Sequence, residues 1–430
     1  YDKSSRFAGD NKSAVFPSFS AGWVMSSEDW FNNSGVVNRL KLKGSWGQLG
    51  SQDLPVNNPT KTLYAFNIDV ANYVFGGNSP GVSDGAILSS IGNENLKWET
   101  SVTSNLGIEL DLFNSKLSTS LEFYQIITDG LFARNSNLIP TTGPEAPPPF
   151  VNLGEVKNTG VDWSVSYNNT WDNGFSLGAT FNLSHYKNEV VSLVNGTPIN
   201  GNALTSWAGA YTRTEEGEPI SYFYGRKISG FDDTGRWVYE DVNEDGVVDD
   251  NDRTKIGSPH PDFTYGLNIN AGFKGFDLSA FFNGSQGNDI YNHNQIFNFP
   301  NFPNGNRTTA VLDSWRPDNT NASMPALSNS LQGVEVNAND FFVEDGSFFR
   351  LKNLQLGYSL PSETTDKMGM ERFRIYLQGT NLFTITGYNG IDPEILPRSI
   401  GGQAENLNMG IDSRTYPLSQ IFTIGLNIKF

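Results

Sequence analysis

The feature that most constrains the fold of this sequence is period-two alternation of apolar and polar residues. About eleven segments show it, most of them roughly ten residues or longer. One runs from Trp98 to Leu112, and another fills the last nine positions, from Phe422 to Phe430. Because successive side chains of a strand point to opposite faces, each segment predicts a strand with one apolar and one polar face. The sequence therefore predicts an all-β protein.

Short turn sequences join several of these segments into hairpins. Trp171-Asp172-Asn173-Gly174 separates one pair, and Lys274-Gly275 separates another. Turns of this length connect neighbouring strands that run in opposite directions. The strands are therefore expected to be antiparallel throughout.

The connections between predicted strands alternate between short and long along the whole chain. The short ones lie near 26–38, 113–115, 172–174, 274–275 and 361–371, and the long ones near 3–14, 50–96, 128–158, 188–260, 283–346 and 386–418. Bacterial outer-membrane barrels have short periplasmic turns and long extracellular loops, whereas a soluble sandwich has no reason to sort its loops. We therefore predict a transmembrane antiparallel β-barrel in the outer membrane, with the loop at 188–260 outside the cell.

Composition excludes several other classes of protein. The 430 residues include no cysteine and 3 scattered histidines, which argues against thiol chemistry and zinc clusters. The formal net charge is −17, which argues against nucleic-acid binding. No run of 18 apolar residues could form a membrane-spanning helix, but a barrel strand faces lipid with only every second residue. Catalytic motifs are also missing, and the sequence predicts that the protein is not an enzyme.

The number of predicted strands, about eleven, is odd, and this bears on whether the chain can close into a barrel by itself. A closed barrel of one bacterial chain has an even number of strands, and an open sheet edge is not stable in lipid. The chain also begins at Tyr1 without a signal peptide. We therefore expect residues 1–430 to be a fragment of about 11 strands, the C-terminal part of one larger barrel.

One acidic segment has the spacing of a calcium-binding loop. Counted from Asp241, oxygen-bearing side chains occupy positions 1, 3, 5, 9 and 12, glycine occupies position 6, and a main-chain carbonyl is expected to ligate at position 7. The candidate metal ligands are Asp241, Asn243, Asp245, Val247, Asp249 and Asp252. The segment predicts a divalent cation that orders the long loop.

The same segment departs from the usual pattern at its end. Asp252 stands where a glutamate normally binds the metal through both oxygens, and no pair of flanking helices is evident. Ca²⁺ is favoured and Mg²⁺ is an alternative. The alternative interpretation is a solvated acidic turn without a metal.

Several segments of the sequence resemble segments of the SusC/RagA-like family of TonB-dependent outer-membrane transporters, and they occur in the same order along the chain. They include FPSFSAGWVMSSEDWF at 16–31, NENLKWETSVTSNLGIELDLF at 93–113, DVNEDGVVDDNDRTKIGSPHPDFTYGLNINAGF at 241–273 and VEDGSFFRLKNLQLGYSLP at 343–361. The resemblance extends over essentially the whole chain.

The resemblance implies a 22-stranded barrel of which this chain is the C-terminal part. Its family members have an N-terminal plug domain and a TonB-interacting segment, for which these 430 residues contain no counterpart. It further implies import of oligosaccharides or peptides, powered through TonB, with a SusD-like surface lipoprotein as partner.

Two other functions stay open at this point. The chain could be a passive outer-membrane porin, or a calcium-stabilised surface protein used for binding or adhesion. The sorted loop lengths argue against the second, and the sequence preceding Tyr1 would decide between a porin and a gated importer.

Overall fold

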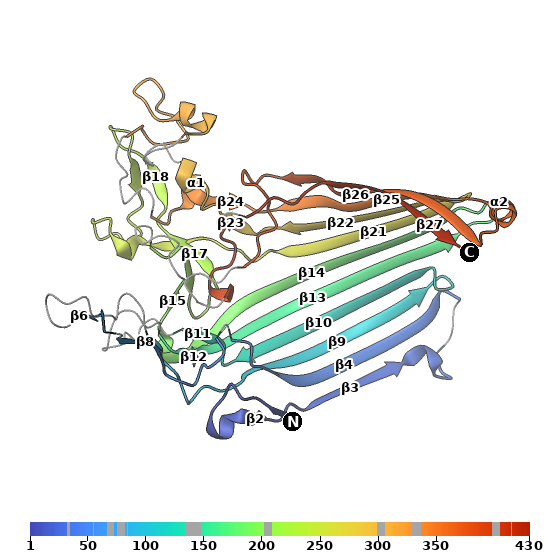
Figure 1. Ribbon diagram of the computed structural model, residues 1–430, viewed down its shortest axis with the longest axis horizontal. Helices are drawn as coiled ribbons and strands as arrows, with labels where there is room; N and C mark the ends of the chain where they lie inside the picture. The colour runs from blue at the N-terminus through green and yellow to red at the C-terminus, as the bar shows by residue number, and fades with distance from the viewer. Residues whose placement is uncertain are drawn as a thin grey trace.

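The computed structural model describes residues 1–430 except 32–34, 55, 67–72, 75–81, 84, 135–147, 202–208, 299–305, 329–336, 398–404 and 414. Within these residues, long strands form one twisted, eleven-stranded antiparallel sheet (Figure 1). Its strands are β3 (Ser18–Val24), β4 (Val37–Ser51), β9 (Glu99–Leu112), β10 (Leu117–Asp129), β13 (Gly154–Thr170), β14 (Ser176–Leu193), β21 (Phe263–Phe273), β22 (Phe276–Gln286), β25 (Phe348–Ser359), β26 (Arg372–Thr386) and β27 (Ile421–Lys429).

Each strand of this sheet pairs with the next long strand along the chain. The order β27-β26-β25-β22-β21-β14-β13-β10-β9-β4-β3 is a simple meander, with β3 and β27 at its two edges. The sheet is curved and open, so the described chain is a partial barrel. This confirms the predicted fold class, strand direction and number of strands.

All five short connections lie at one end of the sheet, as the sequence predicts. In Figure 1 this is the right-hand end, where α2 (Ser362–Lys367) lies between β25 and β26. The β21–β22 turn has φ angles of 47° at Lys274 and 86° at Gly275. Two successive positive φ angles are typical of the hairpin turn whose twist matches that of the strands. The local sequence thus fixes the tight turns.

The long connections form a layer at the other end of the sheet. Its strands are short: β1 (Asp2–Lys3), β2 (Ser13–Ala14), β5 (Leu63–Phe66), β6 (Tyr73–Val74), β7 (Val82–Ser83), β8 (Ala86–Ser90), β11 (Phe132–Arg134), β12 (Phe150–Asn152), β15 (Ile199–Asn200), β16 (Thr212–Thr214), β17 (Tyr222–Gly225), β18 (Ile228–Phe231), β19 (Trp237–Tyr239), β20 (Thr254–Gly257), β23 (Asp289–Tyr291) and β24 (Val343–Asp345). We call this the loop layer.

Helices in the described residues are all short. They are α1 (Gln295–Asn298), α2 and the 3₁₀ turns η1 (Gly9–Lys12), η2 (Met25–Ser27), η3 (Val194–Gly196), η4 (Asp250–Asp252), η5 (Thr309–Asp313), η7 (Asp340–Phe342) and η8 (Glu405–Leu407). Among the residues that the structure describes, none of the helices has the length and hydropathy needed to cross a membrane.

The buried hydrophobic core lies mainly in the loop layer and at the strand ends next to it. Its largest cluster joins three long connections and contains Tyr211, Phe223, Trp237, Tyr239, Tyr291, Ile296, Ala338, Phe342 and Ile411. A second cluster includes Val156 and Val190, where β13 and β14 enter the layer. Because residues from three connections share one core, the described parts of these loops form one folded unit.

Two predicted boundaries are wrong. The connections predicted at 128–158 and 188–260 are shorter, because β13 already begins at Gly154 and β14 continues to Leu193. There the strands pass beyond the alternating band, and Val156, Val190 and Leu193 are buried in the loop layer while Val191 is exposed, so period-two alternation no longer marks these segments.

Candidate functional site: the polar inner wall and the loop layer

The two faces of the sheet differ in chemistry along continuous rows of paired residues. One row, read across paired strands from β3 to β21, contains Trp23, Leu42, Ile108, Leu121, Trp163, Leu183 and Tyr265. The adjacent row, one residue along each strand, contains Gly22, Lys43, Gly107, Glu122, Asp162, Ser184 and Thr264. Paired residues point to the same face, so one face is apolar and the other polar. We call the polar face the inner wall.

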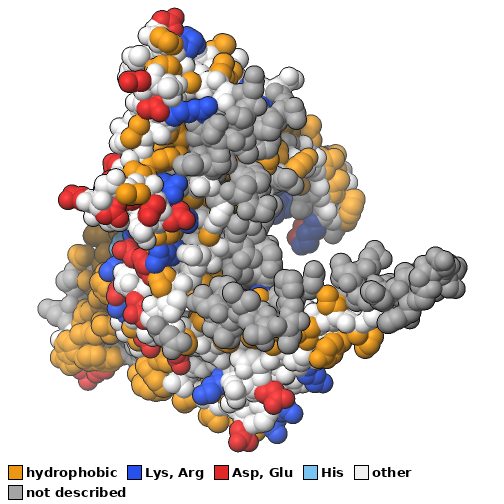
Figure 2. Space-filling view, turned by 90° about the vertical axis from the view of Figure 1, so that its left-hand side faces the viewer, with side chains coloured by type: hydrophobic (Ala, Val, Ile, Leu, Met, Phe, Trp, Pro, Cys, Tyr) orange, Lys and Arg blue, Asp and Glu red, His pale blue; other side chains and the backbone are white. Residues whose placement is uncertain are grey.

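The apolar face is exposed to its surroundings. Phe19, Leu106 and Phe123 are at least half exposed, and so are most of the apolar side chains of β27. In Figure 2, hydrophobic side chains lie along the outer rim, whereas acidic and basic side chains mix over the loop end. An exposed apolar band over a whole sheet is the surface that lipid covers.

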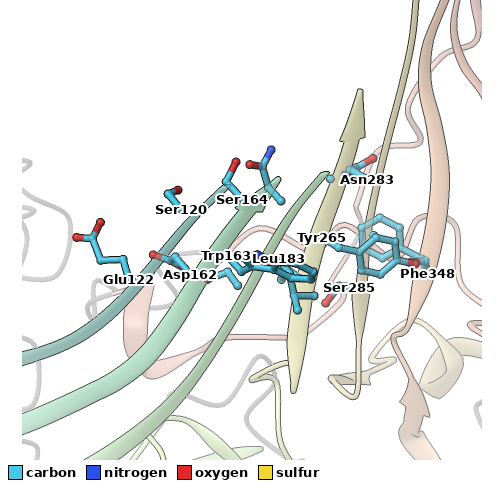
Figure 3. Close-up of a pocket in the computed structure, with 15 residues that line it drawn as sticks. Ser120, Glu122, Asp162, Trp163, Ser164, Leu183, Tyr265, Asn283, Ser285 and Phe348 are labelled. Atoms are coloured by element: carbon cyan, nitrogen blue, oxygen red, sulfur yellow. Dashed lines mark hydrogen bonds between the residues drawn. The ribbon is translucent and has the colours of Figure 1, made fainter. Parts of the chain in front are cut away.

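A hollow of about 500 Å³ lies on the inner wall. Seven of the fifteen residues that line it carry small polar side chains: Ser120, Ser164, Asn182, Ser184, Thr264, Asn283 and Ser285. Figure 3 shows Ser120 and Glu122 of β10, Ser164 of β13 and Asn283 of β22 extending to the same side of the sheet. Hydroxyl and amide groups in these positions can bind a polar solute or a polar protein segment.

Acidic and basic side chains form a ladder on the inner wall at β4, β9 and β10. The Lys43 ammonium lies 2.8 Å from a Glu122 carboxylate oxygen and 3.5 Å from Glu109, and Lys41 lies 3.3 Å from Glu109. Glu122 pairs in register with Asp162 on β13, whose carboxylate accepts a 2.5 Å hydrogen bond from the Ser184 hydroxyl. The ladder neutralises acidic groups that would otherwise repel each other across the strands.

A second ionic cluster fastens the segment 387–396 to the inner wall. The Arg350 guanidinium, on β25, donates a 2.7 Å hydrogen bond to Asp392 and another to Glu394. Lys352 donates to both oxygens of Glu394 at 2.9 and 2.6 Å, and the Asn283 amide donates to it at 3.1 Å. We call residues 387–396 the strap.

The strap is also fastened to the loop layer. The Tyr388 hydroxyl donates a 2.6 Å hydrogen bond to the buried Asp412, and the Asn389 backbone N–H donates to Glu344 at 2.8 Å. Burial, followed by the hydrogen bond to Asp412, raises the pKa of Tyr388, which therefore stays protonated. Because the strap binds both parts, it connects the inner wall with the loop layer.

The acidic segment 241–252 folds into the compact loop that its spacing predicts. The Asp241 carboxylate accepts hydrogen bonds from the backbone N–H groups of Asp245, at 3.2 Å, and Gly246, at 2.8 Å. The Asn243 side chain accepts a hydrogen bond from the Asp245 N–H at 3.0 Å, and its amide donates to the Asp245 carboxylate at 3.0 Å. Gly246 adopts a φ of 85° at the sharp turn. Asp241, Asn243 and Asp245 therefore lie together.

The two remaining side chains of the predicted metal site are engaged with backbone. The buried Asp252 carboxylate accepts hydrogen bonds from the N–H groups of Asp249 at 2.7 Å and Val242 at 2.8 Å, while Asp249 caps η4. These backbone hydrogen bonds, that from Asp249 above all, lower the pKa of Asp252. No group of three or more His, Asp or Glu side chains converges as a metal cage within the described ranges. The cation and the ligation by Val247 stay predictions.

The three histidines lie apart, as their spacing predicts. The half-buried His260 ring lies between the Ile220 carbonyl, at 2.8 Å, and the Tyr186 hydroxyl, at 3.2 Å. His185 contacts the Asp262 carbonyl, and His293 packs on Tyr211 with ring centroids 5.4 Å apart. Their partners are main-chain and aromatic groups, which gives them structural roles.

The comparison with protein-family models assigns the chain. Residues 1–382 match the model described as TonB dependent receptor-like, beta-barrel. The chain belongs to the TonB-dependent receptor β-barrel family. The protein is thus an outer-membrane protein and, like its relatives, not an enzyme, which confirms both predictions. The alternative of a calcium-stabilised surface protein used for binding or adhesion is wrong, because the family is one of TonB-dependent receptors.

Similar proteins of this family include TonB-dependent receptor P3 of Formosa agariphila, 33% identical over 100% of this chain and 43% of that protein. TonB-dependent receptor SusC of Bacteroides thetaiotaomicron is 28% identical over 100% of this chain and 41% of that protein. A solved structure of the RagAB peptide transporter matches with a TM-score of 0.81 and 27% identity, over 100% of this chain and 44% of that chain. The chain thus spans less than half the length of these relatives.

Sequence reasoning missed the strap and both ionic clusters. Their partners are separated by 42 residues for Arg350 and Asp392 and by 68 for Lys41 and Glu109. A signal was nevertheless present, since Arg350 and Lys352 occupy alternate positions of a predicted strand and an acidic pair follows in the next long connection. Only the register between strands shows which acid meets which base.

Proposed function

We propose that the chain forms the C-terminal part of the barrel of a TonB-dependent importer. The importer carries oligosaccharides or peptides across the outer membrane. A SusD-like surface lipoprotein lies over its extracellular end and TonB supplies the energy. The observation that carries this proposal is the pair of opposite rows, apolar outside and polar inside, which make the sheet a wall between lipid and an aqueous passage.

The polar hollow favours the import of a solute that forms many hydrogen bonds. Its lining is rich in serine, threonine and asparagine side chains, which are suited to sugar hydroxyls and to peptide groups alike. The loop layer supports a protein partner, because its connections are folded around a common core and present a fixed surface.

The test uses the full-length transporter in its own outer membrane. Uptake of labelled oligosaccharide and peptide pools is measured with and without the gene, and with and without functional TonB. We expect uptake of one pool to require both. Uptake that persists without TonB would instead identify a passive porin.

A matched pair of variants tests whether this sheet lines the passage. Ser164→Trp fills the hollow on the inner wall, whereas Val165→Trp, at the next position of β13, faces the lipid. We expect uptake to fall at least severalfold with Ser164→Trp and to stay unchanged with Val165→Trp, at equal amounts of folded protein. The opposite result would place the passage elsewhere.

A further inference from the structure

At several places on this sheet, a tyrosine ring lies over a glycine of the neighbouring strand. Tyr265 on β21 lies over Gly284 on β22, so that a methyl group added at Gly284 would be 2.5 Å from the tyrosine oxygen. The hydroxyl reaches β25, the strand beyond, and donates to the Phe348 carbonyl at 3.4 Å. The glycine leaves room for the ring, and the hydroxyl joins two strands that are not neighbours.

The same arrangement occurs at β10, β13 and β14. Tyr124 on β10 lies over Gly160 on β13, where an added methyl group would again be 2.5 Å from the hydroxyl oxygen. Here Ser184, on the same face of β14, is the polar side chain that the hydroxyl approaches. In both cases the tyrosine, the glycine and the group that the hydroxyl approaches lie on three successive strands.

A third tyrosine and glycine lie at the edge of the sheet. Tyr376 on β26 covers Gly425 on β27, and an added methyl group would be 2.3 Å from its hydroxyl oxygen. The Arg374 guanidinium lies 5.1 Å from the ring centroid and is held by Asp277 on β22, on the side away from β27. The ring is therefore fixed over the edge strand, with its hydroxyl directed past it.

The strand that would complete this third arrangement does not belong to the described chain. β27 is the last strand of the sheet, and Phe422 and Ile424 are about three-quarters exposed. An edge with unpaired N–H and C=O groups is costly in lipid. The relatives are more than twice as long as this chain, which covers 41 to 44% of them.

We propose that the Tyr376 hydroxyl donates a hydrogen bond across Gly425 to a main-chain carbonyl of a β-strand that pairs with the free edge of β27. That strand comes from the part of the same protein outside these 430 residues.

The experiment replaces Tyr376 by the photoreactive residue p-benzoylphenylalanine in the full-length transporter within its outer membrane. After irradiation, mass spectrometry identifies the cross-linked peptides. We expect the probe to join the segment around 376 to a segment outside 1–430 of the same molecule. The control is the same probe at Tyr265, which should cross-link to the residues around Phe348 on β25.

Two results would overturn the proposal. One is cross-linking of the probe at 376 only to residues within 1–430 or to lipid. The other is a cross-link between two copies of the protein, seen as a band of doubled mass. If the probe at 376 lowers the amount of folded barrel, the same probe is placed at Asn427, which lies on the face of β27 that Tyr376 covers. The expected cross-linked segment is the same. This outcome is independent of whether the protein imports a solute.

Discussion

Arg350 and Asp392 form a buried ion pair of 2.7 Å, in which both side chains are less than a tenth exposed. They join β25 of the inner wall to the strap that follows β26. Removing one member of such a pair leaves an unpaired charge in a poorly solvated place, which costs about 3–5 kcal/mol, whereas replacing both by apolar groups costs far less. The pair therefore fixes the position of the strap.

The first prediction concerns this pair. Arg350→Met should release the strap and make residues 387–396 at least tenfold more sensitive to protease, because Asp392 and Glu394 lose their guanidinium partner. The double variant Arg350→Met with Asp392→Leu should restore part of the protection. Lys352→Met is the control with a smaller effect, since Lys352 is one-third exposed. Equal sensitivity of all three variants would contradict the assignment.

The second prediction concerns Gly107, over which Lys43 reaches Glu122. A methyl group added at Gly107 would lie 2.6 Å from the Lys43 side chain, so Gly107→Ala should break this ion pair. Because both charged groups are about one-third exposed, the loss of stability should be small, below about 1 kcal/mol. A double-mutant cycle with Lys43→Met checks this, because the two changes should be clearly non-additive. Full additivity would mean that the glycine is unrelated to the pair.

The sequence predicted the fold well because the lipid-facing side of a barrel must alternate. Leu106, Ile108 and Leu110 could be assigned to one face of β9 without knowing any partner strand. The strap and the ladder could not be predicted in this way, since Arg350 and Asp392 meet only through the register of β25 and the path of a long loop. Likewise, spacing brought Asp241, Asn243 and Asp245 together but did not reveal that Asp252 would bind backbone N–H groups.

The third prediction concerns the cation of the loop 241–252. Ca²⁺ at Asp241, Asn243, Asp245, Asp249 and the Val247 carbonyl, with Asp252 completing the site, should protect the loop from protease in the full-length transporter. Asp245→Ala should remove this protection and leave the barrel folded, while Asp233→Ala, in a neighbouring turn, should not. Equal protease sensitivity with Ca²⁺, with Mg²⁺ and with excess chelator would identify a plain acidic turn.

The fourth prediction concerns pH and His260. Burial lowers the pKa of His260 below its ordinary value of about 6.5, and the nearby Lys255 acts in the same direction. The neutral ring is therefore favoured in the folded state, so its contribution is complete above about pH 6.5 and is lost as the pH falls through the lowered pKa. Hydrogen exchange of residues 258–262, corrected for intrinsic rates, should quicken between pH 7 and 5. His260→Gln should abolish the change, and an unchanged profile in that variant would exclude the histidine.

The central claim is that the sheet crosses the outer membrane with its loop layer outside the cell. The absence of cysteine from the 430 residues makes single-cysteine labelling of this part of the protein direct. Asp233→Cys places a thiol in the loop layer, and Asn173→Cys places one in the β13–β14 turn at the opposite end. In intact cells, a membrane-impermeant maleimide should label the full-length Asp233→Cys variant, and should label the Asn173→Cys variant only after the outer membrane is permeabilised. Labelling of the Asn173→Cys variant in intact cells, or equal labelling of both variants there, would contradict this account.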